Sequence, residues 1–185
     1  MKIINSPFQG CYLLKEKVIA DKRGHFSETF NYNFLKEKIN SDYFVQENES
    51  FSNKKVIRGM HYQLPPHAHG KLIQCIKGEI YDVFIDIRCN SETFGQWAGI
   101  KLNDENFKQV WLPKGFAHGF LTISKFAKIL YKITSHYNPN SERTIRWDDP
   151  KIKIEWPKLG MNYLLSEKDS NSNLFDYENL MNINF

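Results

Sequence analysis

The residues best suited to catalysis lie in one short stretch, from Val56 to Lys71, which holds three of the six histidines of this 185-residue chain. His61 lies in a predicted strand, with its side chain on the same face as that of Gln63. An imidazole titrates near neutral pH and can act as a general base, although a hydrogen-bonded structural histidine is the alternative. Lys71 could stabilise a developing oxyanion in a pocket, or lie at an exposed strand end. The stretch therefore indicates acid–base chemistry on a small molecule.

Arg58 lies three positions before His61. A strict two-residue strand period places these two side chains on opposite faces of the strand. A bulge or kink at Gly59 would bring both to one face, because glycine in a strand often marks such a feature. The two side chains share a pocket only in that second case.

Other candidate groups lie far apart in the chain. Tyr131 falls in an apolar run typical of core packing, but its hydroxyl could donate a proton if the ring lines a cavity. Asp169 could cap a helix, or hold an imidazole in one tautomer. Arg23, Arg58 and Lys168 could bind a diphosphate, and each could instead form a surface ion pair.

A metal site is the minority interpretation. The pair His67 and His69, followed much later by His118, is similar to the two-part metal-binding pattern of cupin barrels. Ile73 and Gln74 occupy the positions where that pattern supplies a glutamate. Three neutral imidazoles can bind zinc, but the anionic ligand is missing. We therefore predict no metal, with His67 and His69 in a solvated loop.

Composition narrows the class of protein. The length suits one domain, and 14 Phe, 9 Tyr and 4 Trp suit a β-rich fold with a large pocket or interface. The net charge of +4 comes from interleaved acids and bases, which argues against nucleic-acid binding. No leader and no long apolar run is present, so we expect no membrane association. Three cysteines without metal spacing favour the cytoplasm.

The periodicity predicts many short strands punctuated by Gly, Pro and Asn, which indicates a sandwich or barrel. In the strand from Ile80 to Arg88, the odd-numbered residues are expected to face a packed core and the even-numbered ones a wetter surface or cavity. A short helix is predicted from Asn33, as its cap, to Ile39. The Asn-rich tail from about residue 170 is expected to be loosely held.

Eight motifs occur in one order from about Val18 to Asp169, and they resemble those of the dTDP-4-dehydrorhamnose 3,5-epimerase family. In sequence letters they are DKRGHFSETF from Asp21, QENES from Gln46, RGMHYQ from Arg58, KLIQ from Lys71, SETFGQW from Ser91, PKGFAHGF from Pro113, LYK from Leu130 and SEKD from Ser166.

The resemblance implies an all-β, cupin-type jelly roll with a few short helices, forming a single domain over residues 1–185. It also implies a homodimer that exchanges N-terminal strands. The implied reaction converts dTDP-4-dehydro-6-deoxy-D-glucose to dTDP-4-dehydro-L-rhamnose without metal or cofactor. The alternatives are a mono-epimerase, an epimerase of another nucleotide-linked 4-keto sugar, or a metal-binding cupin without this activity.

The resemblance also assigns roles. His61 would be the base, paired with Asp169; Tyr131 would supply a proton from the other face of the sugar, and Lys71 would stabilise the enolate. The implied substrate-binding residues are Arg23, Phe26, Glu28, Gln46, Asn48, Arg58, His118, Tyr137, Glu142 and Lys168. Arg23 and Glu28 lie on the N-terminal segment and would reach the partner's site. The chain departs from the family pattern at His69, where glutamine is common, and at His25, where an apolar or aromatic residue is common.

Overall fold

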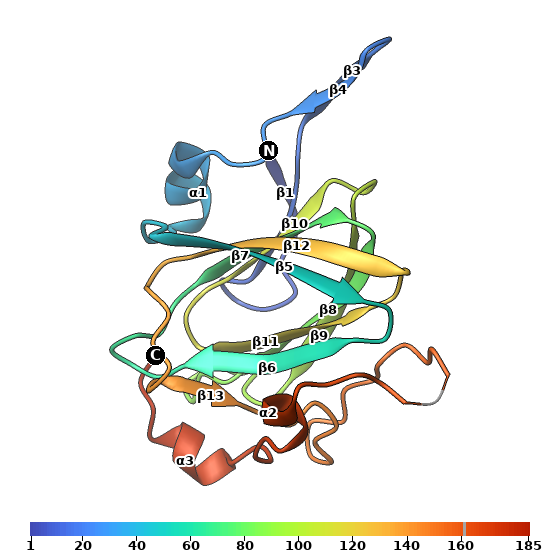
Figure 1. The fold of residues 1–185 in the computed structure, drawn as a ribbon. Coiled ribbons are helices and arrows are strands. Elements are labelled where there is room, and N and C mark those ends of the chain that lie inside the picture. The colour runs from blue at the N-terminus through green and yellow to red at the C-terminus, as the bar shows by residue number, and fades with distance from the viewer. Residues whose placement is uncertain (161) are drawn as a thin grey trace.

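The fold consists of two antiparallel β-sheets that face each other, with a small hairpin extending from one end (Figure 1). The computed structural model describes residues 1–160 and 162–185. In spatial order, the six-stranded sheet contains β1 (Lys2–Asn5), β2 (Tyr12–Lys15), β10 (Lys108–Leu112), β7 (Lys71–Lys77), β12 (Phe126–Ile133) and β5 (Gln46–Asn53). The five-stranded sheet contains β13 (Glu142–Thr144), β6 (Ile57–Gln63), β11 (Phe116–Thr122), β8 (Glu79–Asp86) and β9 (Trp97–Asn103). The predicted all-β jelly roll is confirmed.

The main core lies between the two sheets. Phe84 from β8 and Phe116 from β11 pack edge to face, and Phe8, in the loop after β1, contacts both rings. Ile73 from β7 and Ile129 from β12 meet this group from the other sheet and are fully buried. Large aromatic and branched side chains suit this interior because they fill the space between two pleated surfaces.

Strand β8 is buried on both faces. Its odd-numbered residues face a packed apolar cluster as predicted, whereas Phe84, on the even-numbered face, lies in the main core and not at a wetter surface or cavity. Val83 and Ile85 point away from the space between the sheets, into a second apolar cluster that includes Phe175 and Leu180. Phe84 points inward and is also fully buried. Strand periodicity separates two faces but does not say which face a later part of the chain will cover.

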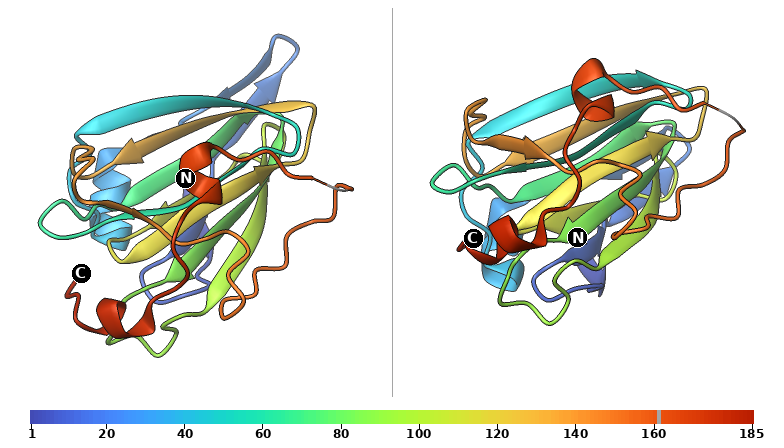
Figure 2. Two further views of the ribbon diagram at one scale, coloured as in Figure 1. Left: turned by 60° about the horizontal axis from the view of Figure 1, so that its bottom comes forward. Right: turned by 90° about the horizontal axis from the view of Figure 1, so that it is seen from below.

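The C-terminal segment provides that cover (Figure 2). It crosses the outer face of the five-stranded sheet and carries α2 (Glu167–Ser170) and α3 (Tyr177–Met181). Phe175 and Leu180 are only 4% and 2% exposed. The expectation of a loosely held tail from about residue 170 is wrong, because these two apolar side chains anchor an otherwise polar segment.

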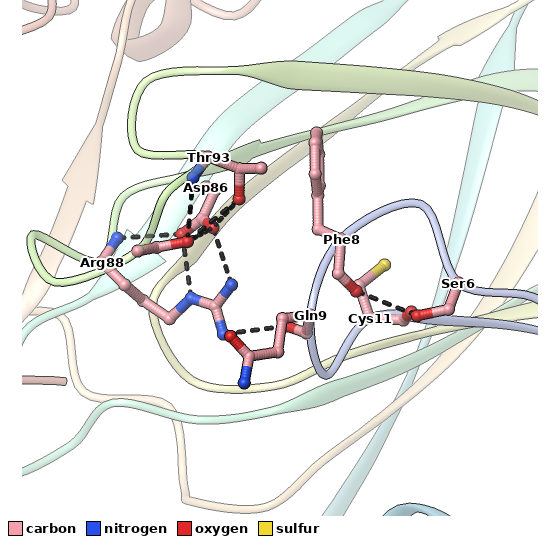
Figure 3. A network of polar contacts seen from close by, with 8 residues as sticks. Ser6, Phe8, Gln9, Cys11, Asp86, Arg88 and Thr93 are labelled. Atoms are coloured by element: carbon pink, nitrogen blue, oxygen red, sulfur yellow. Dashed lines mark hydrogen bonds and ion pairs between the residues drawn. The ribbon is translucent and has the colours of Figure 1, made fainter.

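A network of polar contacts joins the loop after β1 to the end of β8 (Figure 3). The buried Asp86 accepts hydrogen bonds from Arg88 Nε at 2.9 Å and Arg88 Nη2 at 2.6 Å. Arg88 Nη1 also donates to the Gln9 carbonyl at 2.9 Å, and Thr93 Oγ1 donates to Asp86 at 2.6 Å. Asp86 and Arg88, expected on a wetter surface, therefore form an ion pair that connects two loops.

The helix in the first third of the chain, α1 (Tyr32–Ile39), packs on the outer face of the six-stranded sheet. Its cap is Asn31, whose Oδ1 accepts from the Phe34 backbone N–H at 3.0 Å, and not Asn33 as predicted. Both asparagines are good caps, but the helix begins at Tyr32, so Asn31 precedes it and Asn33 lies in its first turn.

The hairpin β3 (Val18–Asp21) and β4 (Gly24–Ser27) extends away from both sheets (Figure 1). Ile19 and Phe26 are paired directly across it and are 57% and 69% exposed. Its base is held by Glu16, which accepts a hydrogen bond from Ser27 Oγ at 2.7 Å and from Gln109 Nε2 at 2.8 Å. An isolated hairpin with an exposed apolar pair is a surface that a partner could cover.

No helix among the described residues has the length and apolar character needed to cross a membrane.

Candidate active site

A cavity of about 400 Å³ lies between the two sheets, and side chains from both sheets line it. It contains three of the four predicted catalytic residues, His61, Lys71 and Tyr131, and the fourth, Asp169, lies directly behind His61. Seven predicted substrate-binding residues also line it: Gln46, Asn48, Arg58, His118, Tyr137, Glu142 and Lys168. Residues separated by more than a hundred positions therefore meet in one place.

His61 and Asp169 form a close pair. His61 comes from β6, Asp169 from α2, and Nε2 of the imidazole lies 2.6 Å from Oδ1 of the carboxylate. Burial opposes ionisation of Asp169, but hydrogen bonds from His61, Ser166 and the Gly59 backbone outweigh it, so its pKa lies below the usual value. An ionised carboxylate only accepts hydrogen bonds, so Nε2 of His61 carries the proton and Nδ1 keeps the lone pair of a base.

The alternative in which Gly59 bends the strand is confirmed. Between the pairs His118–His61 and Phe120–Arg58, β6 contains one residue more than β11. Gly59 has a φ of +123°, and an added Cβ would lie 2.4 Å from the Gly119 Cα. The extra residue brings Arg58 and His61 to the same cavity, where a regular strand would separate them.

Lys71 is a buried cation at the floor of the cavity. It is 8% exposed, and its Nζ donates to the His61 carbonyl at 3.0 Å. Burial lowers the pKa of Lys71 to about 8, against the attraction of Glu142 and Asp82. A partly desolvated ammonium interacts strongly with a developing negative charge, because little water screens it.

Tyr131 faces the cavity from β12, in the sheet opposite His61. Part of its ring also packs against the core between the sheets, so both interpretations of this residue apply. Burial raises the pKa of Tyr131, Arg58 lowers it and Glu142 raises it, with the net shift upward. The phenol therefore stays protonated at neutral pH and has a proton to donate.

Glu142 connects two other predicted substrate contacts at the cavity rim. Its Oε2 accepts from the Tyr137 hydroxyl at 2.7 Å and forms an ion pair with Lys168. Burial opposes its ionisation, but the bonds from Lys168 and Tyr137 and the nearby His61 lower its pKa overall. This rim can therefore present both a cation and a phenol to a charged ligand.

His118 is paired with a residue that sequence reasoning missed. Its Nε2 lies 2.7 Å from Oδ1 of Asp82, which is fully buried. The signal was present in the alternation of β8, which placed Asp82 on the side of a wetter surface or cavity. The residue types gave no indication that His118 would be its partner.

Four further polar residues line the cavity without having been assigned to the site: Ser50, Tyr62, Gln63 and His69. Gln63 Nε2 lies 3.0 Å from His69 Nδ1, so His69 lies against the cavity wall and the solvated-loop expectation for it is wrong. Burial, helped by Lys71 and His118, lowers the pKa of His69 to about 3. Among the described residues, no group of three or more His, Cys, Asp or Glu side chains is arranged to hold a metal.

Arg23, Phe26 and Glu28 do not line the cavity of their own chain. Arg23 and Phe26 are on the extended hairpin, where Arg23 pairs with Asp21, and Glu28 directly follows it and accepts from Asn31. All three predicted residues are exposed. Apolar lining residues such as Ile129 and Ile133 were also missed, because nothing in an apolar strand separates core positions from cavity positions.

Known proteins resemble this chain in both sequence and fold. The family model described as dTDP-4-dehydrorhamnose 3,5-epimerase matches residues 5–176. The dTDP-4-dehydrorhamnose 3,5-epimerase of Shigella flexneri is 46% identical over 176 residues, which cover 95% of this chain and 96% of that protein. The crystal structure of dTDP-6-deoxy-D-glucose-3,5-epimerase from Legionella pneumophila, in complex with dTDP-4-keto-L-rhamnose, has a TM-score of 0.89 and 44% identity, covering 94% of this chain and 92% of that one.

A more distant solved structure is a 3'-monoepimerase from Streptomyces bikiniensis in complex with dTDP-quinovose. It has a TM-score of 0.86 and 29% identity and covers 91% of this chain and 85% of that one. The fold is thus shared by enzymes described as inverting one carbon and by enzymes described as inverting two. From the family match and the near full-length identity, this chain belongs to the dTDP-4-dehydrorhamnose 3,5-epimerase family.

Proposed function

We propose that this chain inverts C3 and C5 of dTDP-4-dehydro-6-deoxy-D-glucose and so forms dTDP-4-dehydro-L-rhamnose. The observation that supports this most strongly is the placement of His61 and Tyr131 on opposite sheets of one cavity. Lys71, from the same sheet as Tyr131, lines this cavity and donates to the His61 carbonyl. Inversion needs a base and an acid on opposite faces of the sugar ring. It also needs a cation near the oxygen that becomes negative.

The first step is removal of a proton by His61. C3 and C5 both flank the C4 ketone, so loss of the proton from either carbon gives an enolate. Nδ1 of His61 accepts the proton, because Nε2 is already bonded to Asp169 at 2.6 Å. The resulting imidazolium is stabilised by the carboxylate behind it. Lys71 faces the developing charge on O4 of the substrate.

The second step is return of a proton from the other face. Tyr131 is protonated at neutral pH and lines the wall opposite His61. Its hydroxyl donates to the carbon that lost its proton, which inverts that centre and leaves a phenolate beside Arg58. The substrate's own ketone supplies the electron sink for both inversions.

The substrate's nucleotide part fits the polar side of the cavity. Arg58 and Lys168 provide positive charge for the diphosphate, and Gln46 and Asn48 offer amide groups on β5. Tyr137 and Glu142 add a phenol and a carboxylate at the same rim. The same residues would bind a related nucleotide-linked 4-keto sugar, which keeps a mono-epimerase or another sugar substrate as the second candidate.

A homodimer would complete this site. We infer that the hairpin β3–β4 of one chain covers the cavity of a second copy, bringing Arg23, Phe26 and Glu28 to the nucleotide. The exposed pair of Ile19 and Phe26 supports this, because such a pair is rarely left in water. We further propose that residues 1–185 form one domain. The three unpaired cysteines favour a reducing compartment such as the cytoplasm.

Proton exchange in heavy water tests the reaction. The wild-type protein is incubated with the substrate in D₂O, and loss of the C3 and C5 proton signals is followed by NMR. We expect exchange at both carbons, and near abolition of both in His61→Asn with dTDP binding retained. Exchange at one carbon only would refute double epimerisation, and no exchange at either would refute the proposal altogether.

Mixing two variants tests the dimer. His61→Asn lacks the base and Phe26→Ala lacks the hairpin contact, so each alone should be weakly active. After subunit exchange in an equal mixture, half of the dimers are mixed and one site in each is intact, which gives about a quarter of wild-type activity. No recovery in mixed dimers would exclude the sharing of the hairpin.

A further inference from the structure

Of the three histidines that line the cavity, His61 is the proposed base and His118 is a predicted substrate contact, whereas His69 has no assigned role. His69 precedes Lys71 by two residues, so the two side chains project to the same side of the chain. Gly70 between them is fixed by two hydrogen bonds with Thr134: its N–H donates to Thr134 Oγ1 at 2.8 Å, and its carbonyl accepts from the Thr134 backbone N–H at 3.2 Å. Trp111 packs where a Gly70 side chain would lie. His69 and Lys71 are therefore held side by side.

The orientation of the Gln63 amide determines which nitrogen of His69 carries its proton. Gln63 Oε1 accepts from the Asn138 backbone N–H at 2.7 Å, and Gln63 Nε2 donates to the His67 carbonyl at 2.7 Å. A flipped amide would place an oxygen against that carbonyl and an NH₂ group against an N–H. The NH₂ group therefore faces His69 Nδ1 at 3.0 Å. It also lies 3.2 Å from the His136 carbonyl, so these two acceptors share its second hydrogen.

Facing a donor, Nδ1 of His69 keeps its lone pair and the proton lies on Nε2. A charged imidazolium would place a second N–H against the Gln63 NH₂ group, so protonation is disfavoured. The low pKa of His69, which burial and the nearby Lys71 and His118 produce, agrees with this. No bond to Nε2 is described anywhere in residues 1–160 and 162–185, and the ring lines the cavity.

We propose that His69 is a neutral hydrogen-bond donor, set in its Nε2–H tautomer by Gln63, that binds the same substrate oxygen as Lys71, namely O4 at the C4 carbonyl. This inference rests on the proposed epimerisation and adds a second donor to the oxyanion site. A neutral N–H beside a cation shares the developing charge without raising the local positive charge. Lys71 is thereby spared a charged neighbour that would further weaken its own protonation.

Three variants and one spectroscopic measurement test the proposal. His69→Leu removes the donor, His69→Gln keeps an N–H near the same place, and His67→Leu is the matched control on the same loop. Deuterium exchange at C3 and C5 is measured for each, together with KM and dTDP binding. The tautomer of His69 is read from ¹⁵N NMR of histidine-labelled wild-type protein, with His69→Gln identifying its signals.

We expect His69→Leu to slow exchange at both carbons by about 10²-fold through kcat, because both steps pass through charge on the same oxygen. His69→Gln and His67→Leu should stay within about tenfold of wild type. The ¹⁵N signals should show a neutral Nε2–H ring from pH 5.5 to 8. The proposal is overturned by an Nδ1–H or charged ring, by unchanged exchange in His69→Leu, or by an effect on KM or dTDP binding alone. Absence of exchange in the wild type would instead refute the proposed function and leave the tautomer measurement valid.

Discussion

Replacing Asp169 by asparagine tests the catalytic pair with almost no change of shape. Gly59 and Ser166 both donate hydrogen bonds to this carboxyl group, in addition to His61. The oxygen of an asparagine would be retained by those donors, which leaves its NH₂ group facing Nε2 of His61. The imidazole proton would then move to Nδ1, the atom that must accept the substrate proton. The variant therefore loses both the charge and the correct tautomer.

The size of the loss follows from the contact distance. With Nε2 and Oδ1 2.6 Å apart, the centres of the imidazolium and carboxylate charges are about 4 Å apart. Two unit charges at that distance attract by about 4 kcal/mol at an effective dielectric constant of about 20. Each 1.36 kcal/mol in the barrier changes the rate about tenfold, so charge alone accounts for about 10³-fold. The wrong tautomer adds to this loss.

Deuterium exchange at C3 and C5 is the assay, because it reports proton abstraction separately from inversion. We expect Asp169→Asn to slow exchange at both carbons by about 10³-fold or more while dTDP binding stays near wild type. Asp148→Asn, an exposed acid that pairs with Arg146, is the matched control and should retain full activity. Exchange within tenfold of wild type in Asp169→Asn would refute the role given to the pair.

Three further predictions concern the acid, the cation and the strand bulge. Tyr131→Phe should keep deuterium exchange while losing most net inversion, because abstraction does not need the returning acid; equal loss of the two would contradict this division. The wild-type rate should fall as pH rises through about 8, where Lys71 loses its proton. Lys71→Met should be slow at every pH and should lack that decline. A flat wild-type pH profile would count against the role given to the Lys71 ammonium. Gly59→Ala should lower the free energy of unfolding in urea by about 3 kcal/mol, because the new Cβ meets Gly119. The control is Gly24→Ala, which also has a positive φ but has open space around it, and it should lower the same free energy by about 1 kcal/mol. Equal losses in the two alanine variants would show that the close approach at Gly59 is not what matters.

Local patterns were enough for the fold class and for the chemistry. Short strands separated by Gly, Pro and Asn predicted a two-sheet or barrel architecture, and an imidazole, a phenol and an ammonium indicated an acid–base reaction. Strand periodicity in β8 also placed Asp82 and Val83 correctly on opposite faces of the sheet. These features depend on residue type and near neighbours, which a sequence contains directly.

Other features depended on contacts between distant parts of the chain. Only the register between β6 and β11 shows that Gly59 bulges and brings Arg58 beside His61. Only the path of the C-terminal segment shows that Phe175 covers a sheet. Local patterns left Asp169 as either a helix cap or an imidazole partner, the family resemblance paired it with His61, and the fold brings the two together across 108 positions. Likewise, the tautomer of His69 follows from three strand and loop segments meeting at Gln63.

The residue types by themselves determined that this chain could form sheets and carry a base, an acid and a cation. Which side chains share a cavity, and which atom of each is free to react, was decided by packing. The physical reason is that strand pairing and burial are set by the lowest free energy of the whole chain, and a single position carries little of that information.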